Sequence, residues 1–528
     1  MSSHELPPLP RGWLWSRVGE VGEVRLGRQR SPKDHVGDYM RPYLRVANVY
    51  EARIDTSDVL HMNFTPEEFK IYELRPGDIL LNEGQSLEWV GRPAIYRGEV
   101  PGACFQNTLV RFRAYSCVLP EFALLVFRAY LHSQRFQRIA KWTTNIAHLG
   151  AQRFAELEFP VPPLAEQQRI IAEAEALLSD LDAGVVALKR VRSNLKRYRA
   201  SVLKAACEGR LVPTEAELAR AEGRDYEPAD KLLERILNER QRKWEDKRKG
   251  KSPGGDTWKP HYTPLLSPDD VLGGLPKGWC WASIDQLAHV GTGATPLRSR
   301  RAFYEGGTVA WVTSGALNDS FVRFATEFVT GQALAETNLT LYPPRTLLVA
   351  MYGEGKTRGK CSELLIPATT NQAIAALAFD GEAHETRDFV KVFLHASYEA
   401  MRRSSSGGVQ PNLNLGIIRR LCVPLPPLAE QARIVEAVHR SLSVIEQLES
   451  TLDAQSKRAA RLLQSILKRA FEGKLVPQDP NDEPPSVLLE RIRQERASPT
   501  VKSAPEQMSL GLEKSKKPRA SHRRSASS

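Results

Sequence analysis

The polar residues of this sequence are not spaced as catalytic motifs require. Gly353-Glu-Gly-Lys-Thr357 contains the end of a phosphate-binding loop, but the full pattern needs a glycine where Ala350 stands. Tyr342-Pro-Pro-Arg345 lacks the residues that flank the Pro-Pro core of amino-methylating enzymes, so it predicts a turn. The 11 histidines form no metal-binding or metalloprotease motif. We therefore expect a chain without catalytic residues of its own.

The cysteines argue against a structural metal and against a disulfide framework. They are scattered singly, without a Cys-x-x-Cys pair, at Cys104, Cys117, Cys207, Cys280, Cys361 and Cys422. Isolated thiols suit a reducing compartment. The first residues lack a signal-peptide pattern, and no apolar stretch approaches the roughly 18–20 residues of a membrane span. These features predict a cytoplasmic protein without a membrane segment, metal or cofactor.

The charge of the chain favours a polyanionic partner. Its formal net charge is +12, with a pI near 9.3. Part of this excess lies in residues 498–528, which are rich in Lys, Arg, Ser and Pro and which we expect to be a disordered basic tail. The remaining chain is only mildly basic, so charge alone does not distinguish DNA from other anionic partners.

Sequence-specific DNA binding would need side chains that pair with base edges. In residues 20–150 the candidates are Arg28, Arg30, Lys33, Asn48, Gln85, Lys141, Trp142 and Asn145. In residues 286–412 they are Arg298, Arg300, Arg301, Tyr352, Lys356, Arg358, Arg402 and Arg403. Taken singly, each residue is more simply explained as an ordinary solvated side chain. The close pairs and triplets of cations favour phosphate contacts.

A tandem duplication organises the elements that would carry these residues. Leu9-Pro-Arg-Gly-Trp-Leu-Trp15 recurs as Leu275-Pro-Lys-Gly-Trp-Cys-Trp281. Pro162-Pro-Leu-Ala-Glu-Gln-Gln-Arg-Ile170 recurs as Pro426-Pro-Leu-Ala-Glu-Gln-Ala-Arg-Ile434. We call these repeated sequences the opening and closing motifs. Because Trp13 and Trp279 belong to the shared opening motif, we expect them in the framework core and not at a base.

Between the two motifs the copies diverge. Residues 20–150 and 286–412 share little beyond short β-rich runs separated by turn signals and helical pieces. This pattern predicts two mixed α/β (α+β) globules with different surfaces. One framework thus holds two variable modules.

A long helix follows each closing motif. Apolar residues recur in alternating steps of four and three, which is typical of a coiled-coil seam. In the first copy the seam comprises residues 170, 174, 177, 181, 184, 188, 191, 195, 198, 202 and 205. Two such seams in one chain predict a long antiparallel pair with pseudo-two-fold symmetry that separates the globules. Leu181→Asp or Leu448→Asp should then bury a charge between the helices.

These observations divide the chain into six segments. They are a first globule (1–160), a first helical spacer (161–245), a linker (246–272), a second globule (273–425), a second helical spacer (426–497) and the basic tail (498–528).

The duplicated opening and closing motifs, together with Gly293-Ala-Thr-Pro296 in the second copy, closely resemble the specificity subunits of Type I restriction–modification systems. The first copy departs from this pattern, because it has Leu26-Gly-Arg-Gln-Arg-Ser-Pro32 in place of Gly-x-Thr-Pro. The resemblance implies two target-recognition domains that read the halves of a split, asymmetric site in double-stranded DNA.

The resemblance also implies protein partners. Two adenine-N6 methyltransferase subunits would dock on the helical spacers, and restriction subunits that translocate DNA would join that core. S-adenosylmethionine, ATP and Mg²⁺ would be bound by those partners. The residues that begin each long helix, Glu166, Gln167, Glu430 and Gln431, would either dock the partners or stabilise the first helical turn. A stand-alone DNA-binding regulator remains the alternative function.

Overall fold

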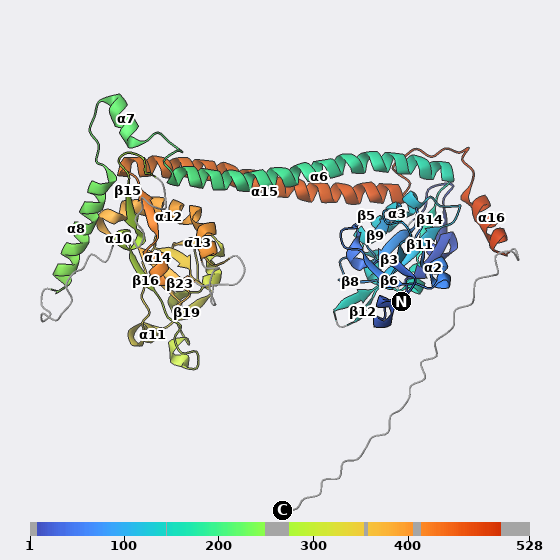
Figure 1. The fold of residues 1–528 in the computed structure, drawn as a ribbon, viewed down its shortest axis with the longest axis horizontal. Helices are drawn as coiled ribbons and strands as arrows, with labels where there is room; N and C mark the ends of the chain where they lie inside the picture. The colour runs from blue at the N-terminus through green and yellow to red at the C-terminus, as the bar shows by residue number, and fades with distance from the viewer. Residues whose placement is uncertain (1–7, 144, 249–273, 353–356, 405–412, 498–528) are drawn as a thin grey trace, which may run out of the picture. The chain divides into compact units, whose positions relative to one another are not determined.

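A computed structural model describes residues 8–143, 145–248, 274–352, 357–404 and 413–497 (Figure 1). The basic tail lies outside the described residues, as does all but the start of the predicted linker. The chain forms two compact units. Unit 1 combines Met1–Val186 with Ser456–Ser528, and unit 2 is the continuous segment Ala187–Gln455. Each unit is described by itself.

The globule of unit 1 is built around a four-stranded antiparallel sheet and the helix α3 (Pro120–His132). The strand order is β2 (Gly22–Leu26), β11 (Leu109–Ala114), β7 (Ile79–Asn82) and β9 (Pro93–Ile95). Phe112 of β11 meets Phe127 of α3 edge to face, with ring centroids 5.1 Å apart. Aromatic packing of this kind fixes the helix on the sheet.

Smaller elements surround this core. The other sheets are β10-β3-β6 (Cys104–Phe105, Met40–Leu44, Leu60–Asn63), β12-β13-β8 (Lys141–Thr143, Ile146–His148, Gly84–Gln85) and β4-β5 (Val49–Tyr50, Arg53–Ile54). The helices are α1 (Val18–Val21), α2 (Pro66–Tyr72), α4 (Arg135–Ile139) and α5 (Ala151–Ala155), with 3-10 turns at Pro32–His35 and Val46–Asn48.

Within its described residues, the globule of unit 2 has two sheets of three or more strands. The larger has the order β16 (His289–Thr292), β23 (Ile374–Ala378), β20 (Leu347–Ala350), β21 (Cys361–Leu364) and β18 (Phe321–Val322). The smaller is β19-β17-β22 (Glu327–Val329, Val309–Val312, Thr369–Thr370). The helices are α10 (Ile284–Leu287), α11 (Gly331–Glu336), α12 (Arg387–Ala396), α13 (Tyr398–Ser404) and α14 (Leu415–Arg419). Three 3-10 turns cover Arg301–Phe303, Ser314–Asn318 and Gly381–Thr386. The predicted α+β class is confirmed in both globules.

A two-stranded ribbon closes each globule. In unit 1, β1 (Leu14–Arg17) pairs antiparallel with β14 (Glu158–Val161). In unit 2, β15 (Cys280–Ser283) pairs in the same way with β24 (Cys422–Leu425). Each ribbon joins the end of an opening motif to the start of a closing motif. The variable residues therefore leave and re-enter the framework at neighbouring points.

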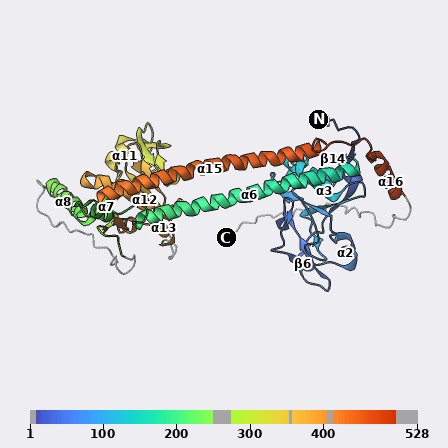
Figure 2. The same ribbon diagram turned by 90° about the horizontal axis from the view of Figure 1, so that it is seen from above.

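The two long helices α6 (Leu164–Cys207) and α15 (Leu428–Phe471) each have 44 residues. In unit 2 they run antiparallel and side by side (Figure 2), because Arg199 pairs with Glu449 at 3.4 Å while Arg192 pairs with Asp453. In unit 1 their other halves share one core with α3, which includes Ile170 and Ile466. Pro162-Pro163 and Pro426-Pro427 precede the helices, where proline is tolerated. The predicted pair of long helices is confirmed.

Only one of the two predicted heptad rows is buried along the middle of the pair. In unit 2, Leu195 packs with Ile445 and Leu452, and all three are buried. The alternate row is exposed, with Tyr198 at 54%, Val191 at 43% and Leu448 at 44%. In this pair, each helix therefore covers only one flank of the other helix's seam. The expectation that Leu448→Asp buries a charge is therefore wrong for the chain alone.

Shorter helices follow each long helix. Unit 2 adds α7 (Glu215–Glu222) and α8 (Ala229–Arg248), drawn green in Figure 1, and unit 1 adds α16 (Pro485–Ala497). Among the described residues, no helix is long and apolar enough to cross a membrane.

Candidate nucleic-acid interface and its framework

A buried tryptophan–glutamate pair anchors the framework of unit 2. The indole Nε1 of Trp279 donates a hydrogen bond to Oε1 of Glu430 at 3.0 Å. The other carboxylate oxygen of Glu430 accepts from the backbone N–H of Glu215 at 2.8 Å. Burial raises the pKa of Glu430, although these two hydrogen bonds act in the opposite direction. The pair ties the opening motif to the first turn of α15.

Unit 1 has a tryptophan and a glutamate, Trp13 and Glu166, at the equivalent positions of its two repeated motifs. Both side chains are buried, and burial raises the pKa of Glu166. The neighbouring Gln167 donates from Nε2 to the carbonyls of Cys117 and Pro162, at 2.9 and 3.1 Å, and accepts from the N–H of Leu119. The prediction that the two opening-motif tryptophans belong to the framework core is confirmed.

The four residues predicted either to dock partners or to stabilise the first helical turn lie inside the framework. Glu166, Gln167, Glu430 and Gln431 are all buried, and Gln431 donates to the carbonyl of Pro426 at 2.8 Å. Their side chains present little surface to another protein. Docking through these side chains stays a prediction, whereas fixing the start of each long helix is their visible task.

The framework also depends on two glycines with left-handed backbones. Gly209 has φ +64°, and a Cβ there would lie 2.5 Å from Pro276 and 3.1 Å from Trp279. Gly473 has φ +63°, and a Cβ there would lie 2.5 Å from Pro10 and 2.9 Å from Trp13. In both units a glycine that follows a long helix lets the chain pass closely over the opening motif.

Two candidate base readers of the first globule are occupied within it. Arg28 contacts Glu68 at 2.7 Å and Asp34 at 3.2 Å, and these carboxylates help to raise its pKa against the effect of burial. Asn48 is only 2% exposed, and its Nδ2 donates to the carbonyls of Asp55 and Asp58. Asn48 stabilises a turn, so the expectation that it is an exposed base reader is wrong.

The other candidates of the first globule fall in two places. Arg30 and Lys33 are exposed around the 3-10 turn, where Arg30 Nε lies 3.0 Å from Nε2 of His35. The sheet β12-β13-β8 brings the remaining four together: Lys141, Trp142, Asn145 and Gln85. Trp142 is 58% exposed at its edge. This hairpin is the part of the globule where predicted residues distant in sequence converge.

In the second globule the predicted arginine cluster is largely neutralised. Arg298 pairs with Glu327 at 2.7 Å and stacks on the rings of Tyr304 and Trp311. Arg300 pairs with Glu336 at 2.6 Å. Arg301 is the most exposed of the three and has only Glu305 at 3.6 Å. Of the predicted phosphate clamp, Arg301 is the member left open to solvent.

The last predicted group surrounds the segment between β20 and β21. Tyr352 is exposed, Arg358 is half-buried, and Arg402 Nη1 donates to Oη of Tyr398 at 3.1 Å. A Cβ on Gly359 would lie 3.6 Å from Arg402, which places α13 beside this segment. Lys356 and the side chain of Arg403 lie outside the described residues.

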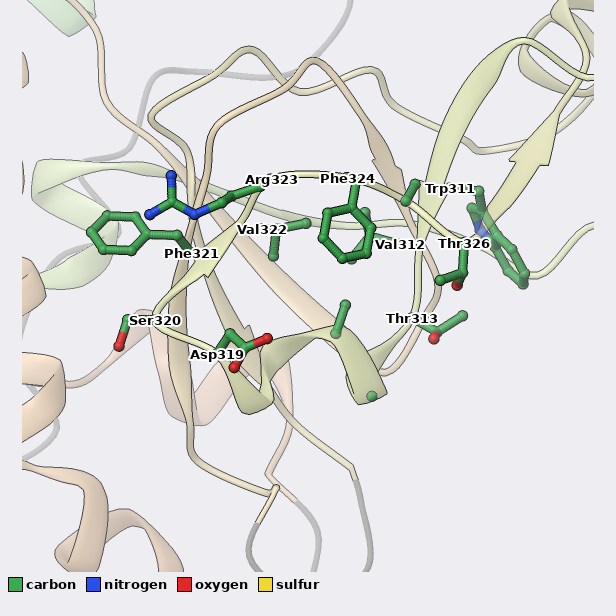
Figure 3. Close-up of a pocket in the computed structure, with 13 residues that line it drawn as sticks. Trp311, Val312, Thr313, Asp319, Ser320, Phe321, Val322, Arg323, Phe324 and Thr326 are labelled. Carbon is green, nitrogen blue, oxygen red and sulfur yellow. The ribbon is translucent and has the colours of Figure 1, made fainter. Parts of the chain in front are cut away.

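A hollow that the sequence did not reveal lies in the second globule (Figure 3). Its volume is about 520 Å³, and β17, β18 and the 3-10 turn at Ser314–Asn318 contribute to its walls. Phe321 and Arg323 lie at one end, Trp311 and Thr326 at the other, and Phe324 between them. Asp319 lines the hollow across from Phe324.

The charged groups of this hollow do not neutralise one another. Among the described residues, neither Asp319 nor Arg323 forms an ion pair, in contrast to Arg298 and Arg300 of the same globule. Arg323 instead lies over the ring of Phe321, at 5.2 Å from its centroid. Neither residue was among the predicted site residues.

The family model for the Type I restriction modification DNA specificity domain matches residues 10–195 and 276–455. The chain belongs to this family. The two matches begin in the two opening motifs and extend into the two long helices, so they follow the duplication. The recognition of the family from the repeated motifs is confirmed.

Relatives of this family match nearly the whole chain. The specificity subunit of the Type I restriction enzyme EcoKI, from Escherichia coli strain K12, is 24% identical, covering 94% of this chain and 98% of its own. The StySPI specificity subunit from Salmonella potsdam is 23% identical, covering 93% and 96%. A chain from a structural study of complex assembly in a type I R-M system superposes with a TM-score of 0.61 at 18% identity, covering 88% and 99%. The last similarity supports the fold.

Proposed function

We propose that this chain is the specificity subunit of a Type I restriction–modification complex and reads a bipartite, asymmetric site in double-stranded DNA. The observation that carries the proposal is one framework, built twice around Trp13 and Trp279, that holds two globules with different surfaces. Because the framework is built twice, each copy would present its own globule to the same DNA duplex. Different surfaces make the two half-sites different.

The chain contributes recognition and no chemistry in this proposal. No group of three or more His, Cys, Asp or Glu side chains within the described ranges could hold a metal ion. Burial raises the pKa of Cys361 to about 12, which disfavours a reactive thiolate. Methylation and cleavage would belong to partner subunits, which would carry S-adenosylmethionine, ATP and Mg²⁺. The complex would act in the cytoplasm.

The exposed heptad row is the surface that supports partner docking. Val191, Tyr198 and Leu448 lie in unit 2, and Leu177 and Leu462 provide similar exposed apolar side chains in unit 1. Such a row could be completed by a helix of another protein packing into a bundle. One row in each unit is consistent with two methyltransferase subunits. Restriction subunits would then join the assembled core.

The test is co-expression of this chain with the methyltransferase subunit of the same host in a strain without its own adenine methylation. We expect the two proteins to copurify, and genome sequencing should reveal N6-methyladenine at one split, asymmetric motif. Chain that binds DNA sequence-specifically but neither retains a methyltransferase nor directs methylation would instead be a stand-alone regulator. Absence of specific DNA binding by the assembled complex would reject both functions.

A further inference from the structure

The hollow of the second globule carries a combination of side chains that the framework does not use. It presents an acidic side chain, a cationic side chain and an exposed aromatic ring, in Asp319, Arg323 and Phe324. A phosphate-binding surface would be basic throughout, because a carboxylate repels the DNA backbone. The mixture instead matches base edges, which offer both donors and acceptors in the major groove.

We propose that the rim of this hollow reads one G·C base pair in the half-site of the second globule, with Arg323 donating to guanine and Asp319 accepting from cytosine. The proposal rests on the proposed function. Arginine forms paired hydrogen bonds with guanine O6 and N7, and a carboxylate accepts from cytosine N4. An A·T pair in either orientation lacks this combination of O6 and N7 acceptors with an N4 donor.

Arg323 is oriented and available for this contact. Its guanidinium lies 5.2 Å from the centroid of Phe321, and Lys391 approaches the same ring at 4.1 Å. The ammonium group of Lys391 is itself paired with the carboxylate of Glu363 at 2.8 Å. Glu363 is therefore engaged by Lys391 and not by Arg323. The ring therefore supports the guanidinium without consuming its hydrogen-bond donors. Phe321 is a positioning residue in this arrangement.

Asp319 gives the site its discrimination. Its backbone carbonyl accepts a hydrogen bond from the hydroxyl of Ser362, which fixes the main chain. Its carboxylate lies at the exposed end of the 3-10 turn, without an ion-pair partner among the described residues. Placed against DNA, the carboxylate would accept from the amino group of cytosine or adenine but would meet an acceptor on guanine or thymine. A guanine or thymine at that position thus leaves a desolvated charge without a partner.

Phe324 supports the same assignment. It is 73% exposed, although a phenyl ring is normally buried in a folded domain. On the rim of the hollow, across from Asp319, it would cover the base-pair edge and exclude water, which strengthens the adjacent hydrogen bonds. A surface designed only for backbone contact has no use for such a ring.

The experiment maps methylated adenines genome-wide for the complex of the full chain with its methyltransferase subunit. The variants are Arg323→Gln, Arg323→Lys and Asp319→Asn, and the control is Arg301→Gln, an exposed arginine of the same globule outside the hollow. We expect each hollow variant to relax one G·C position by about five- to 150-fold in relative methylation. The other half-site should not change. Arg301→Gln should lower methylation evenly across sequences.

The outcomes are distinguishable. An unchanged methylation motif with Arg323→Gln and Asp319→Asn overturns the proposal, and so does relaxation in the other half-site. In either case, a bipartite motif methylated by the wild-type complex would still support the proposed function. A wild-type complex that methylates no specific site overturns both. Thermal unfolding of each variant separates misfolding from altered reading. The charge-conserving Arg323→Lys should relax the motif less than Arg323→Gln, because an ammonium still donates to guanine but lacks the fixed fork of the guanidinium.

Discussion

Placing the same charged residue in the two heptad rows of α15 should separate folding from assembly. Ile445 is fully buried against α6, whereas Leu448, one turn further along, is 44% exposed. Ile445→Asp and Leu448→Asp therefore form a matched pair in one helix. We expect the first to damage mainly the stability of the chain and the second to damage mainly its binding to a partner.

The loss of unfolding free energy expected for each variant depends on how far the replaced side chain is buried. Complete burial of a leucine or isoleucine is worth about 1.5–3 kcal/mol. Leu448 has little more than half of its surface buried, so Leu448→Asp should cost about 1–2 kcal/mol, including the lower helix propensity of aspartate. Ile445→Asp loses the full term and leaves a charge in an apolar contact, for a total above about 4 kcal/mol.

Two assays distinguish the effects of the two variants. Urea unfolding followed by circular dichroism should show a large loss of stability for Ile445→Asp and a small one for Leu448→Asp. Copurification with the methyltransferase subunit should fall at least about 30-fold for Leu448→Asp, since burying its charge against a partner helix costs more than about 2 kcal/mol. Equal destabilisation by the two variants would refute the assignment of buried and exposed rows. Normal copurification of Leu448→Asp would refute the docking role of the exposed row.

Three further predictions follow from the framework and the ribbons. Burial raises the pKa of Glu430, so the folded chain should lose stability as the pH rises through that pKa. Glu430→Gln cannot ionise at this position. Any advantage of the wild type over Glu430→Gln in melting temperature should therefore shrink or reverse between pH 4 and pH 7. A Gly209→Val variant should lose more than about 2 kcal/mol of stability because of its left-handed backbone and the contact with Pro276, whereas Gly184→Ala, which meets nothing, should be neutral or stabilising in the same unfolding assay. Replacing residues 16–160 by the corresponding segment of another family member should change one half of the methylated motif only, because the ribbon β1–β14 returns the chain to its starting point; sequencing that showed both halves altered would contradict modularity.

The duplication and the long helices could be predicted because they depend on local sequence. Repeated motifs report a repeated framework, and the heptad spacing fixes which side chains share a helix face. The spacing does not say which row is covered, since that depends on how many helices pack together. Leu448 and Ile445 are both apolar in the sequence, and only the packing of α15 against α6 distinguishes them.

The candidate interface was harder to predict because charges are neutralised over long sequence separations. Arg28 meets Glu68, forty positions away, and Arg298, which lies in a turn, meets Glu327 of strand β19. Asn48 looks like a base reader in the sequence but closes a turn. Arg323 escaped notice for the opposite reason: it stands alone between Val322 and Phe324, without the neighbouring cations that marked the other arginines. Clusters of cationic residues in the sequence therefore did not identify the arginines that are free of ion pairs in the described fold.

The composition of the two units has a consequence for synthesis on the ribosome. Unit 2 is one continuous segment, whereas the core of unit 1 includes Ile466 and Ala470 from the far end of the chain. Translation at about 5–20 residues per second places on the order of 10–50 s between the two parts of unit 1. The second globule can thus finish folding before the first, although it is made later. Until the end of α15 emerges, the core that contains Ile170 and Ala174 lacks the side chains of Ile466 and Ala470, so the nascent first globule has an incomplete core.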